Sequence, residues 1–193
     1  MTTPLTTRLA TASDIEALVA LVNSAYRGDS SRAGWTTEAH LLDGMRIDAE
    51  RLGAAIANDP DNAILIHEDQ GQLVACVHLQ KTGSNCYLGM LTTLPTRQGS
   101  GLGRAMIEQT ELFAHDHWGS TSMEMTVLTL RPELVAWYER RGYTKTGERK
   151  PFPYGDDKWG LPKRADLEFY VLRKSLTSMT SPGAGGGGST PPC

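Results

Sequence analysis

The residues of this chain with the clearest chemical purpose are three glycines in residues 97–104, whose sequence is RQGSGLGR. Gly99, Gly101 and Gly103 lie between an apolar run at 87–94 and an amphipathic segment at 105–118. Without a Cβ, glycine lets backbone N–H groups approach a ligand closely. A helix that begins there adds unpaired N–H donors and the positive end of its dipole. The segment therefore predicts a phosphate site at a strand-to-helix turn.

The spacing of the glycines distinguishes between the known types of phosphate loop. A nucleoside-triphosphate loop requires Lys-Ser or Lys-Thr after its glycines, and the dinucleotide fingerprint is one residue longer than the pattern here. Residues 98–103 instead match [QR]-x-x-G-x-[GA]. This string resembles the pyrophosphate loop of the GNAT superfamily, the acyl-CoA-dependent N-acyltransferases. The alternative is a glycine-rich turn that only interrupts regular structure.

The order of the predicted elements agrees with that resemblance. Helical spacing and turn residues predict a helix from a capping box at Ser13–Glu16 through Tyr26, a helical region in two pieces around Gly44, a helix over 105–118 and another from Pro132 to Gly142. Strands are predicted over 5–11, 63–68, 73–80, 86–94, 123–130, 143–149 and 167–172. This β-α-α-β-β-β-α-β-α-β-β order is similar to the GNAT arrangement. It implies an α+β fold of three layers, with a central mixed, mostly antiparallel sheet flanked by helices.

A second motif lies near the end of the predicted fold. Residues 134–143, LVAWYERRGY, are similar to the GNAT segment L-x-x-[FW]-Y-x-x-x-G-[FY]. The resemblance therefore spans roughly residues 5–176, and we expect one domain over 1–176. Residues 177–193 are rich in Gly, Ser and Pro, which is typical of a flexible tail or an added linker.

Composition limits the expected partners. A net charge of −3 and an isoelectric point near 5.9 give no basic field to hold nucleic acid or an anionic membrane. The N-terminus does not resemble a signal peptide, and Cys76 and Cys86 are expected to be reduced core thiols of a cytoplasmic protein. Two Cys and two His on neighbouring predicted strands (His67, Cys76, His78 and Cys86) match no standard zinc spacing, so no metal is expected.

The GNAT resemblance implies acetyl-CoA as co-substrate. The backbone N–H groups of the glycine loop would hold its pyrophosphate, and the strand before the loop would pair with the pantetheine arm. Arg131 stands where many relatives have an asparagine, and its guanidinium could reach a CoA phosphate. The expected cofactor-binding residues are Leu91, Thr92, Thr93, Gln98, Gly99, Ser100, Gly101, Leu102, Gly103, Arg104 and Arg131.

The family motif also nominates catalytic residues. Tyr138 is the expected general acid, because a phenol has a pKa of about 10, close to that of a thiol leaving group. The alternative is a tyrosine that only packs its helix. The general base is open: the strand at 86–94 has no acid, which leaves Glu124, His78 or a water relay. The predicted catalytic residues are Tyr138 and Glu124.

The acceptor site is expected in the loops, from Tyr26, Trp35 and Tyr154. Aromatic faces beside the carboxylates of Asp156 and Asp157 would suit a cationic amine; the alternative is that residues 151–159 form a homodimer contact. The predicted function is transfer of an acetyl group to a primary amine of a small molecule, by direct attack in a ternary complex. Alternatives are a protein or peptide acceptor and a non-catalytic acyl-CoA-binding domain.

Overall fold

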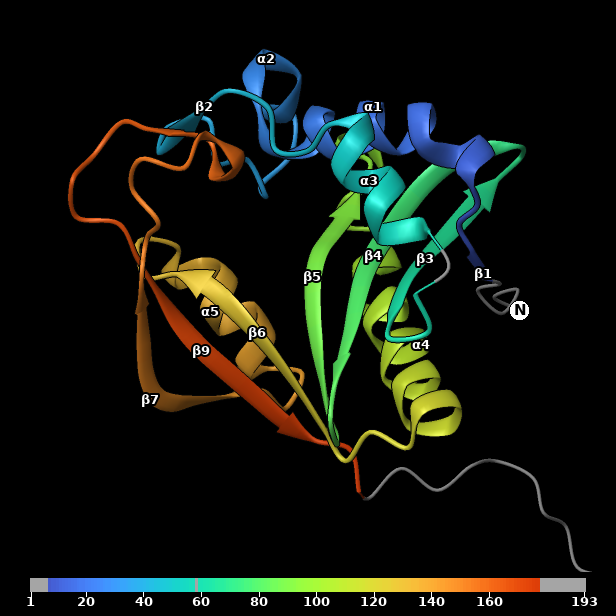
Figure 1. Cartoon of the computed structure of the whole chain (residues 1–193). Helices are drawn as coiled ribbons and strands as arrows, with labels where there is room; N and C mark the ends of the chain where they lie inside the picture. The colour runs from blue at the N-terminus through green and yellow to red at the C-terminus, as the bar shows by residue number, and fades with distance from the viewer. Residues whose placement is uncertain (1–6, 58, 178–193) are drawn as a thin grey trace, which may run out of the picture.

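The computed structural model describes residues 7–57 and 59–177. Its centre is a seven-stranded sheet in the order β1-β3-β4-β5-β6-β9-β7 (Figure 1). The strands are β1 (Arg8–Leu9), β3 (Asn62–Asp69), β4 (Gln72–Thr82), β5 (Asn85–Thr93), β6 (Ser122–Leu128), β7 (Thr144–Pro151) and β9 (Glu168–Ser175). All neighbouring strands are antiparallel except β5 and β6, so the predicted mixed, mostly antiparallel sheet is confirmed.

Helices cover both faces of the sheet. They are α1 (Ile15–Tyr26), α2 (Gly28–Ser31), α3 (Ala49–Ile56), α4 (Leu102–Trp118) and α5 (Pro132–Glu139). On one face, Leu18 of α1 and Leu52 of α3 pack against Ile66. On the other, α4 and α5 bury Met106 and Val135. Apolar side chains at helical spacing on α1, α4 and α5 meet alternating residues of the strands, which produces the three expected layers.

Several local predictions were wrong. Of the two helical pieces expected around Gly44, the second is present as α3, but the first is absent: β2 (Leu42–Asp43) lies there and pairs with β8 (Leu161–Pro162), which comes from the predicted loop before the last strand. The capping box is formed by Thr11 and Asp14 instead of residues 13 and 16, because the Asp14 carboxylate accepts a 2.7 Å hydrogen bond from the Thr11 backbone N–H. Residues 5 and 6 of the predicted first strand, and all but the first residue of the predicted tail, lie outside the described residues.

The strands β5 and β6 separate in the middle of the sheet. Residues 85–87 pair with residues 122–124 at one end, and beyond Tyr87 the two strands diverge into a wedge (Figure 1). On its other side, β5 contains a bulge, because the pairing of Cys76 with Thr92 shifts to His78 with Gly89. Met90 in this bulge has a φ of 54°, an uncommon conformation for a non-glycine residue. The wedge leaves one edge of β5 without a neighbouring strand, next to the glycine loop.

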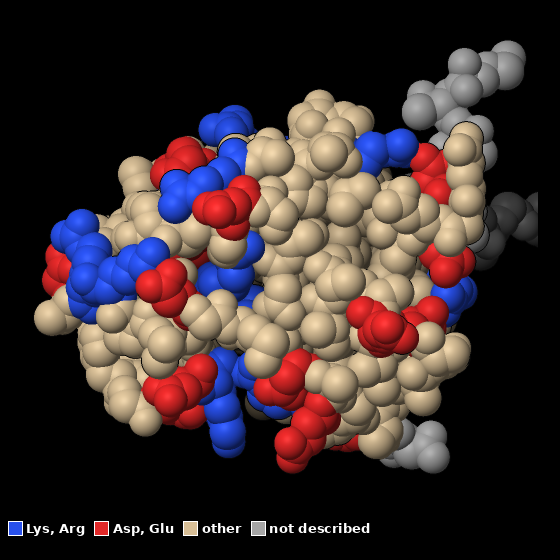
Figure 2. All heavy atoms as spheres, turned by 90° about the horizontal axis from the view of Figure 1, so that it is seen from above, with Lys and Arg blue, Asp and Glu red and all other residues tan. Residues whose placement is uncertain are grey.

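The surface carries mixed charge. Figure 2 shows Lys and Arg interspersed with Asp and Glu on the face seen from above. Within the described ranges, none of the helices has the length and apolar character needed to cross a membrane.

Candidate active site

The glycine loop ends in the N-terminus of α4. Gly99 and Gly101 have φ values of 82° and 88°, in the left-handed region that favours glycine. The backbone N–H groups from residue 99 to residue 104 make no hydrogen bond to another described residue. The Ala105 N–H is the next along the chain, and it donates to the Gly101 carbonyl. A row of free donors at the positive end of a 17-residue helix is a site for an anion.

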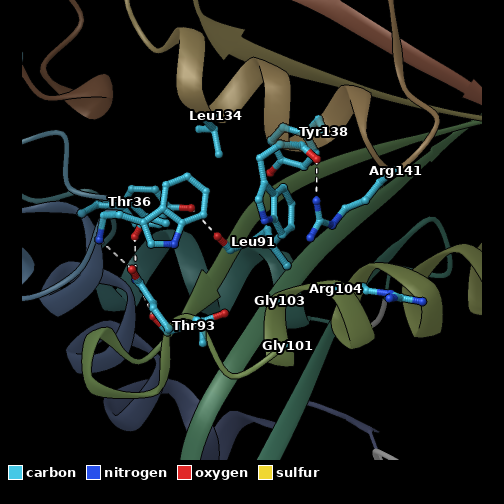
Figure 3. A pocket seen from close by; sticks show the side chains of 14 residues that line it. Thr36, Leu91, Thr93, Gly101, Gly103, Arg104, Leu134, Tyr138 and Arg141 are labelled. Atoms are coloured by element: carbon cyan, nitrogen blue, oxygen red, sulfur yellow. Dashed lines mark hydrogen bonds between the residues drawn. The ribbon is translucent and has the colours of Figure 1, made fainter.

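A cavity of about 260 Å³ opens beside this loop (Figure 3). Leu134 and Tyr138 of α5, with Arg141 just beyond its end, form one side, and Gly101 and Gly103 lie on the other. We call this space the first cavity. Its remaining lining residues are Tyr26, Trp35, Thr36, Leu91, Thr93, Gln98, Gly99, Arg104 and Trp137. Its charged lining residues are two arginines and no carboxylate, so the electrostatics agree with an anionic ligand.

Arg141 is held in place by its own helix. Its guanidinium carbon lies 3.4 Å from the centroid of the Trp137 ring, and Nη1 donates to the Trp137 carbonyl at 2.6 Å. Its Nε is buried without a hydrogen-bond partner among the described residues. Burial lowers the pKa of Arg141, and the neighbouring cations Arg140 and Arg104 lower it further. A cation destabilised in this way would gain most from a bound phosphate.

Gln98 ties the glycine loop to the segment that covers the first cavity. Its Oε1 accepts from the Trp35 backbone N–H at 2.8 Å, and its Nε2 donates to Thr36 Oγ1 at 2.8 Å and to the Thr93 carbonyl at 3.2 Å. A Cβ on Gly34 would lie 2.6 Å from Oε1 of this side chain. Gln98 therefore acts as a brace between two loops that line the cavity.

A second cavity of about 90 Å³ is lined by residues 87–91 of β5 and 125–128 of β6, where these strands have diverged. Four residues line both cavities: Tyr26, Leu91, Leu134 and Tyr138. The other lining residues of the second cavity come from β5, β6, β9, the segment between α1 and α3, the start of α5 and the loop after β7. They include Arg27, Glu38, Arg46, Tyr87, Arg131, Phe152, Trp159 and Phe169. The four shared residues mark the point where ligands in the two cavities would meet.

Two tyrosines stand at this junction. The Tyr26 hydroxyl donates to the Leu91 carbonyl, while the Tyr138 hydroxyl makes no hydrogen bond to a described residue. Burial raises the pKa of Tyr26 to about 12 and raises that of Tyr138 well above the ordinary phenol value. Tyr138 is 7% exposed and contacts Trp137 and Tyr143 edge-on. Both phenols are therefore neutral near pH 7 and keep a proton to donate.

Most of the residues expected to bind the cofactor gather at the first cavity. Leu91, Thr93, Gln98 and Arg104 line it with the three glycines. Four expected residues do not: Arg131, which is described below, and Thr92, Ser100 and Leu102. The buried Thr92 hydroxyl donates to the Met90 carbonyl, the Ser100 hydroxyl donates to the Arg97 carbonyl, and the Leu102 side chain packs against the core. Only the backbone of these three residues could face a ligand there.

Arg131 is built into the protein instead of facing the first cavity. It is 1% exposed, and its guanidinium donates to the carbonyls of Trp35, Thr36 and Thr37 at 3.0–3.3 Å and to Glu133 at 2.5 Å. The structure thus gives it the role of anchoring residues 35–37, and we do not retain it as a ligand for a CoA phosphate.

The expected bases and Tyr154 also lie away from the junction. Glu124 is held by Arg173 at 2.6 Å and lines neither cavity. His78, which also lines neither cavity, has one ring nitrogen 3.0 Å from the Asn62 amide oxygen, and burial lowers its pKa. The Tyr154 hydroxyl bonds to the backbone of Arg164 and Leu167, so it braces its own loop. Trp35 lines the first cavity, on the cofactor side, instead of the acceptor side.

Sequence reasoning missed several lining residues. Trp137 and Arg141 lie inside the recognised motif at 134–143, where they read as helix packing and surface charge. No feature of the sequence marked Thr36 as a lining residue. In the second cavity, Arg27 directly follows the predicted first helix, and Glu38 and Arg46 come from the region around Gly44 that was predicted to be helical. Their convergence depends on the β2–β8 pairing, which the sequence did not indicate.

Comparison with known proteins identifies the family. The family model for the acetyltransferase (GNAT) domain matches residues 37–152, more than half of the chain. The chain belongs to the GNAT acetyltransferase family. Enzymes of this family use acetyl-CoA to acetylate amines, and the free donors and cations of the first cavity fit the CoA phosphates. No curated protein sequence matches this GNAT chain.

Solved structures share the fold at low sequence identity. The ribosomal-protein-S18-alanine N-acetyltransferase of Escherichia coli is 13% identical, with a TM-score of 0.66 over 92% of this chain and 97% of the other. A spermidine N-acetyltransferase SpeG mutant from Vibrio cholerae is 15% identical, with a TM-score of 0.65 over 90% and 94%. A putative phosphinothricin N-acetyltransferase is 19% identical, with a TM-score of 0.65 over 90% and 99%. The fold of this GNAT domain is therefore shared by proteins named for different acceptors.

Proposed function

We propose that this enzyme transfers the acetyl group of acetyl-CoA to a primary amine of a small molecule, by direct attack in a ternary complex. The observation that carries the proposal is the meeting of the two cavities at Tyr26, Leu91, Leu134 and Tyr138. A thioester that enters from the first cavity and an amine that enters from the second would come together there without a covalent enzyme intermediate.

In this proposal the first cavity holds CoA. The N–H groups after Gln98 and the guanidinium of Arg141 bind the pyrophosphate. The pantetheine arm lies in the wedge along the unpaired edge of β5, where Leu91 offers backbone groups. A backbone N–H at this edge polarises the thioester oxygen.

Tyr138 protonates the leaving thiolate. Its hydroxyl has no partner among the described residues, lies on a residue that lines both cavities and keeps its proton at neutral pH. The second cavity has one carboxylate in its lining, Glu38, and that group is engaged by Arg27 at 2.5 Å. We therefore propose that water carries the ammonium proton away, in place of Glu124.

The size of the second cavity favours a small acceptor. A water molecule needs about 10–15 Å³ of such volume, so about 90 Å³ accommodates a few non-hydrogen atoms beyond the amine. The relatives named above act, according to their names, on spermidine, on a ribosomal-protein alanine or on phosphinothricin, so they support an amine acceptor without deciding its size. We place the reaction in the cytoplasm, which the two free buried thiols, Cys76 and Cys86, support.

Thiol release from acetyl-CoA tests the proposal. The purified protein should release CoA with at least one member of a panel of small primary amines, and slowly or not at all with a panel of peptides bearing free N-termini and lysines. Faster release with peptides would overturn the small-molecule acceptor. If the protein binds acetyl-CoA but releases no CoA with either panel, it is a non-catalytic acyl-CoA-binding domain and the proposed function is wrong.

A further inference from the structure

The second cavity carries an excess of positive charge. Its charged lining residues are Arg27, Arg46, Arg131 and Glu38. The aspartates expected from the sequence to attract a cationic amine, Asp156 and Asp157, do not line it. An amine with further positive charge, such as a polyamine, would enter against this field.

Two of the three arginines are largely used by the protein. Arg131 is bound to three carbonyls and Glu133, as described above. Arg27 is 6% exposed; Nη1 pairs with Glu38 at 2.5 Å, and Nη2 lies 3.5 Å from the Trp159 carbonyl. Its Nε nevertheless has no partner among the described residues. A nearly enclosed guanidinium with an unused donor is costly unless a ligand completes its hydrogen bonds.

Arg46 is the third cation and pairs with no carboxylate in the described part of the chain. It is half-buried, and its guanidinium carbon lies 5.8 Å from the centroid of the Tyr26 ring. Because Tyr26 lines both cavities, this places an unpaired positive charge beside the proposed site of transfer. A planar guanidinium with its donors free suits a carboxylate or a phosphonate.

We propose, on the basis of the proposed function, that the acceptor carries an anionic group a few bonds from its amine, and that Arg46 binds this group. Amino acids and aminoalkylphosphonates are the chemical classes that meet this description. The anion cancels the excess charge of the second cavity, and its contact with Arg46 orients the amine toward the junction at Tyr26 and Tyr138.

The test compares acceptors that differ only in the anion. CoA release is measured with a set of α-amino acids, with the corresponding amino acid amides, with aminoalkylphosphonates and with spermidine. We expect kcat/KM for the acids or phosphonates to exceed that for the matched amides by about tenfold or more, because hydrogen bonds to a charged partner contribute about 1.5–3 kcal/mol.

Substitution of Arg46 tests whether this residue supplies the preference. Arg46→Gln should raise KM for the anionic acceptor by about 10- to 100-fold with kcat changed little, and leave the amides unaffected. Arg46→Lys, which keeps the charge, should retain part of the preference. Arg32→Gln is the matched control, since Arg32 pairs with Asp29 on the surface and lines neither cavity. An unchanged melting temperature shows that each variant is folded.

The outcomes separate this inference from the function on which it rests. If spermidine or the amides react as well as the acids, or if Arg46→Gln keeps the preference for acids over amides, the proposal of an anionic acceptor is wrong. The proposed acetyl transfer is not affected by either result. If no amine releases CoA, the proposed function fails. Titration of amino acids and phosphonates into the CoA-loaded protein then decides the inference: binding that Arg46→Gln weakens supports it, and no binding overturns it.

Discussion

The Tyr26 hydroxyl donates a hydrogen bond to the Leu91 carbonyl, at the edge of β5 that faces the wedge. This edge is where the pantetheine arm of acetyl-CoA is proposed to lie. Burial raises the pKa of this phenol to about 12, so it remains protonated and can donate near neutral pH. In the structure as described, a side chain therefore satisfies a backbone group that the co-substrate would also use.

The first prediction concerns this contact. Tyr26→Phe removes the hydroxyl and keeps the ring, so acetyl-CoA no longer competes for the Leu91 carbonyl. One net hydrogen bond is worth about 0.5–1.5 kcal/mol, so the Kd for acetyl-CoA should fall about two- to tenfold, with a similar small loss in the free energy of unfolding. Calorimetric titration measures the Kd. An unchanged Kd would mean that the carbonyl accepts both partners through its two lone pairs.

The second prediction tests Tyr138 as the general acid. Tyr138→Phe should lower kcat by about 10²–10⁴ while changing acetyl-CoA affinity little, because only proton donation is lost. Burial holds the pKa of this phenol far above its ordinary value, so its proton is present at every assay pH and the wild-type rate should not fall between pH 8 and 10 through its ionisation. Tyr143→Phe is the control, since that hydroxyl bonds Glu111 in the core. A kcat within about threefold of wild type would assign Tyr138 to packing.

The third prediction uses the glycine of the loop that tolerates a side chain. A Cβ on Gly103 would meet Thr93 Oγ1 and the Trp137 ring at 3.5 Å, an ordinary contact, and Gly103 lacks the positive φ of Gly101. Gly103→Ala should therefore fold and keep most of its CoA affinity. Gly103→Glu should fold and lose about 100-fold or more, because like charges in contact cost several kcal/mol. Equal affinity of the two folded variants would contradict phosphate binding at this loop.

The fourth prediction concerns Arg131. Arg131→Gln removes a buried guanidinium and leaves the carbonyls of residues 35–37 without their donor, so the free energy of unfolding should fall by about 2–4 kcal/mol. Chemical denaturation measures this loss, and Arg164→Gln, an exposed arginine paired with Asp166, is the control. If stability is unchanged and CoA affinity drops instead, Arg131 contacts a phosphate and our reassignment is wrong.

The local motifs of the site could be predicted from the sequence, because each is encoded within a few residues. The glycine spacing at 99–103 and the segment ending at Gly142 depend on one turn and one helix. The order of strands and helices followed in the same way from periodicity within short segments.

The roles of single charged residues could not be predicted, because they depend on partners far along the chain. Arg131 contacts residues about 95 positions away, and Glu124 on β6 pairs with Arg173 on the neighbouring strand β9. The prediction of the residues that line the acceptor cavity was wrong for the same reason. Its charge depends on Arg27 and Arg46 being brought together with Trp159 by the β2–β8 pairing, and its expected aspartates lie on a loop that turns them away.

The short pairing between β5 and β6 also affects how the protein unfolds. Within the main sheet, three residue pairs join the strands β1-β3-β4-β5 to the strands β6-β9-β7. Beyond them the halves are connected through packed helices, the β2–β8 pairing and the hydrogen bonds of Arg131 to residues 35–37. Acetyl-CoA bound between the glycine loop after β5 and the helix α5 after β6 would contact both halves and hold them together. Its binding should therefore slow amide hydrogen exchange in strands on both sides, and make the two halves open as one cooperative unit.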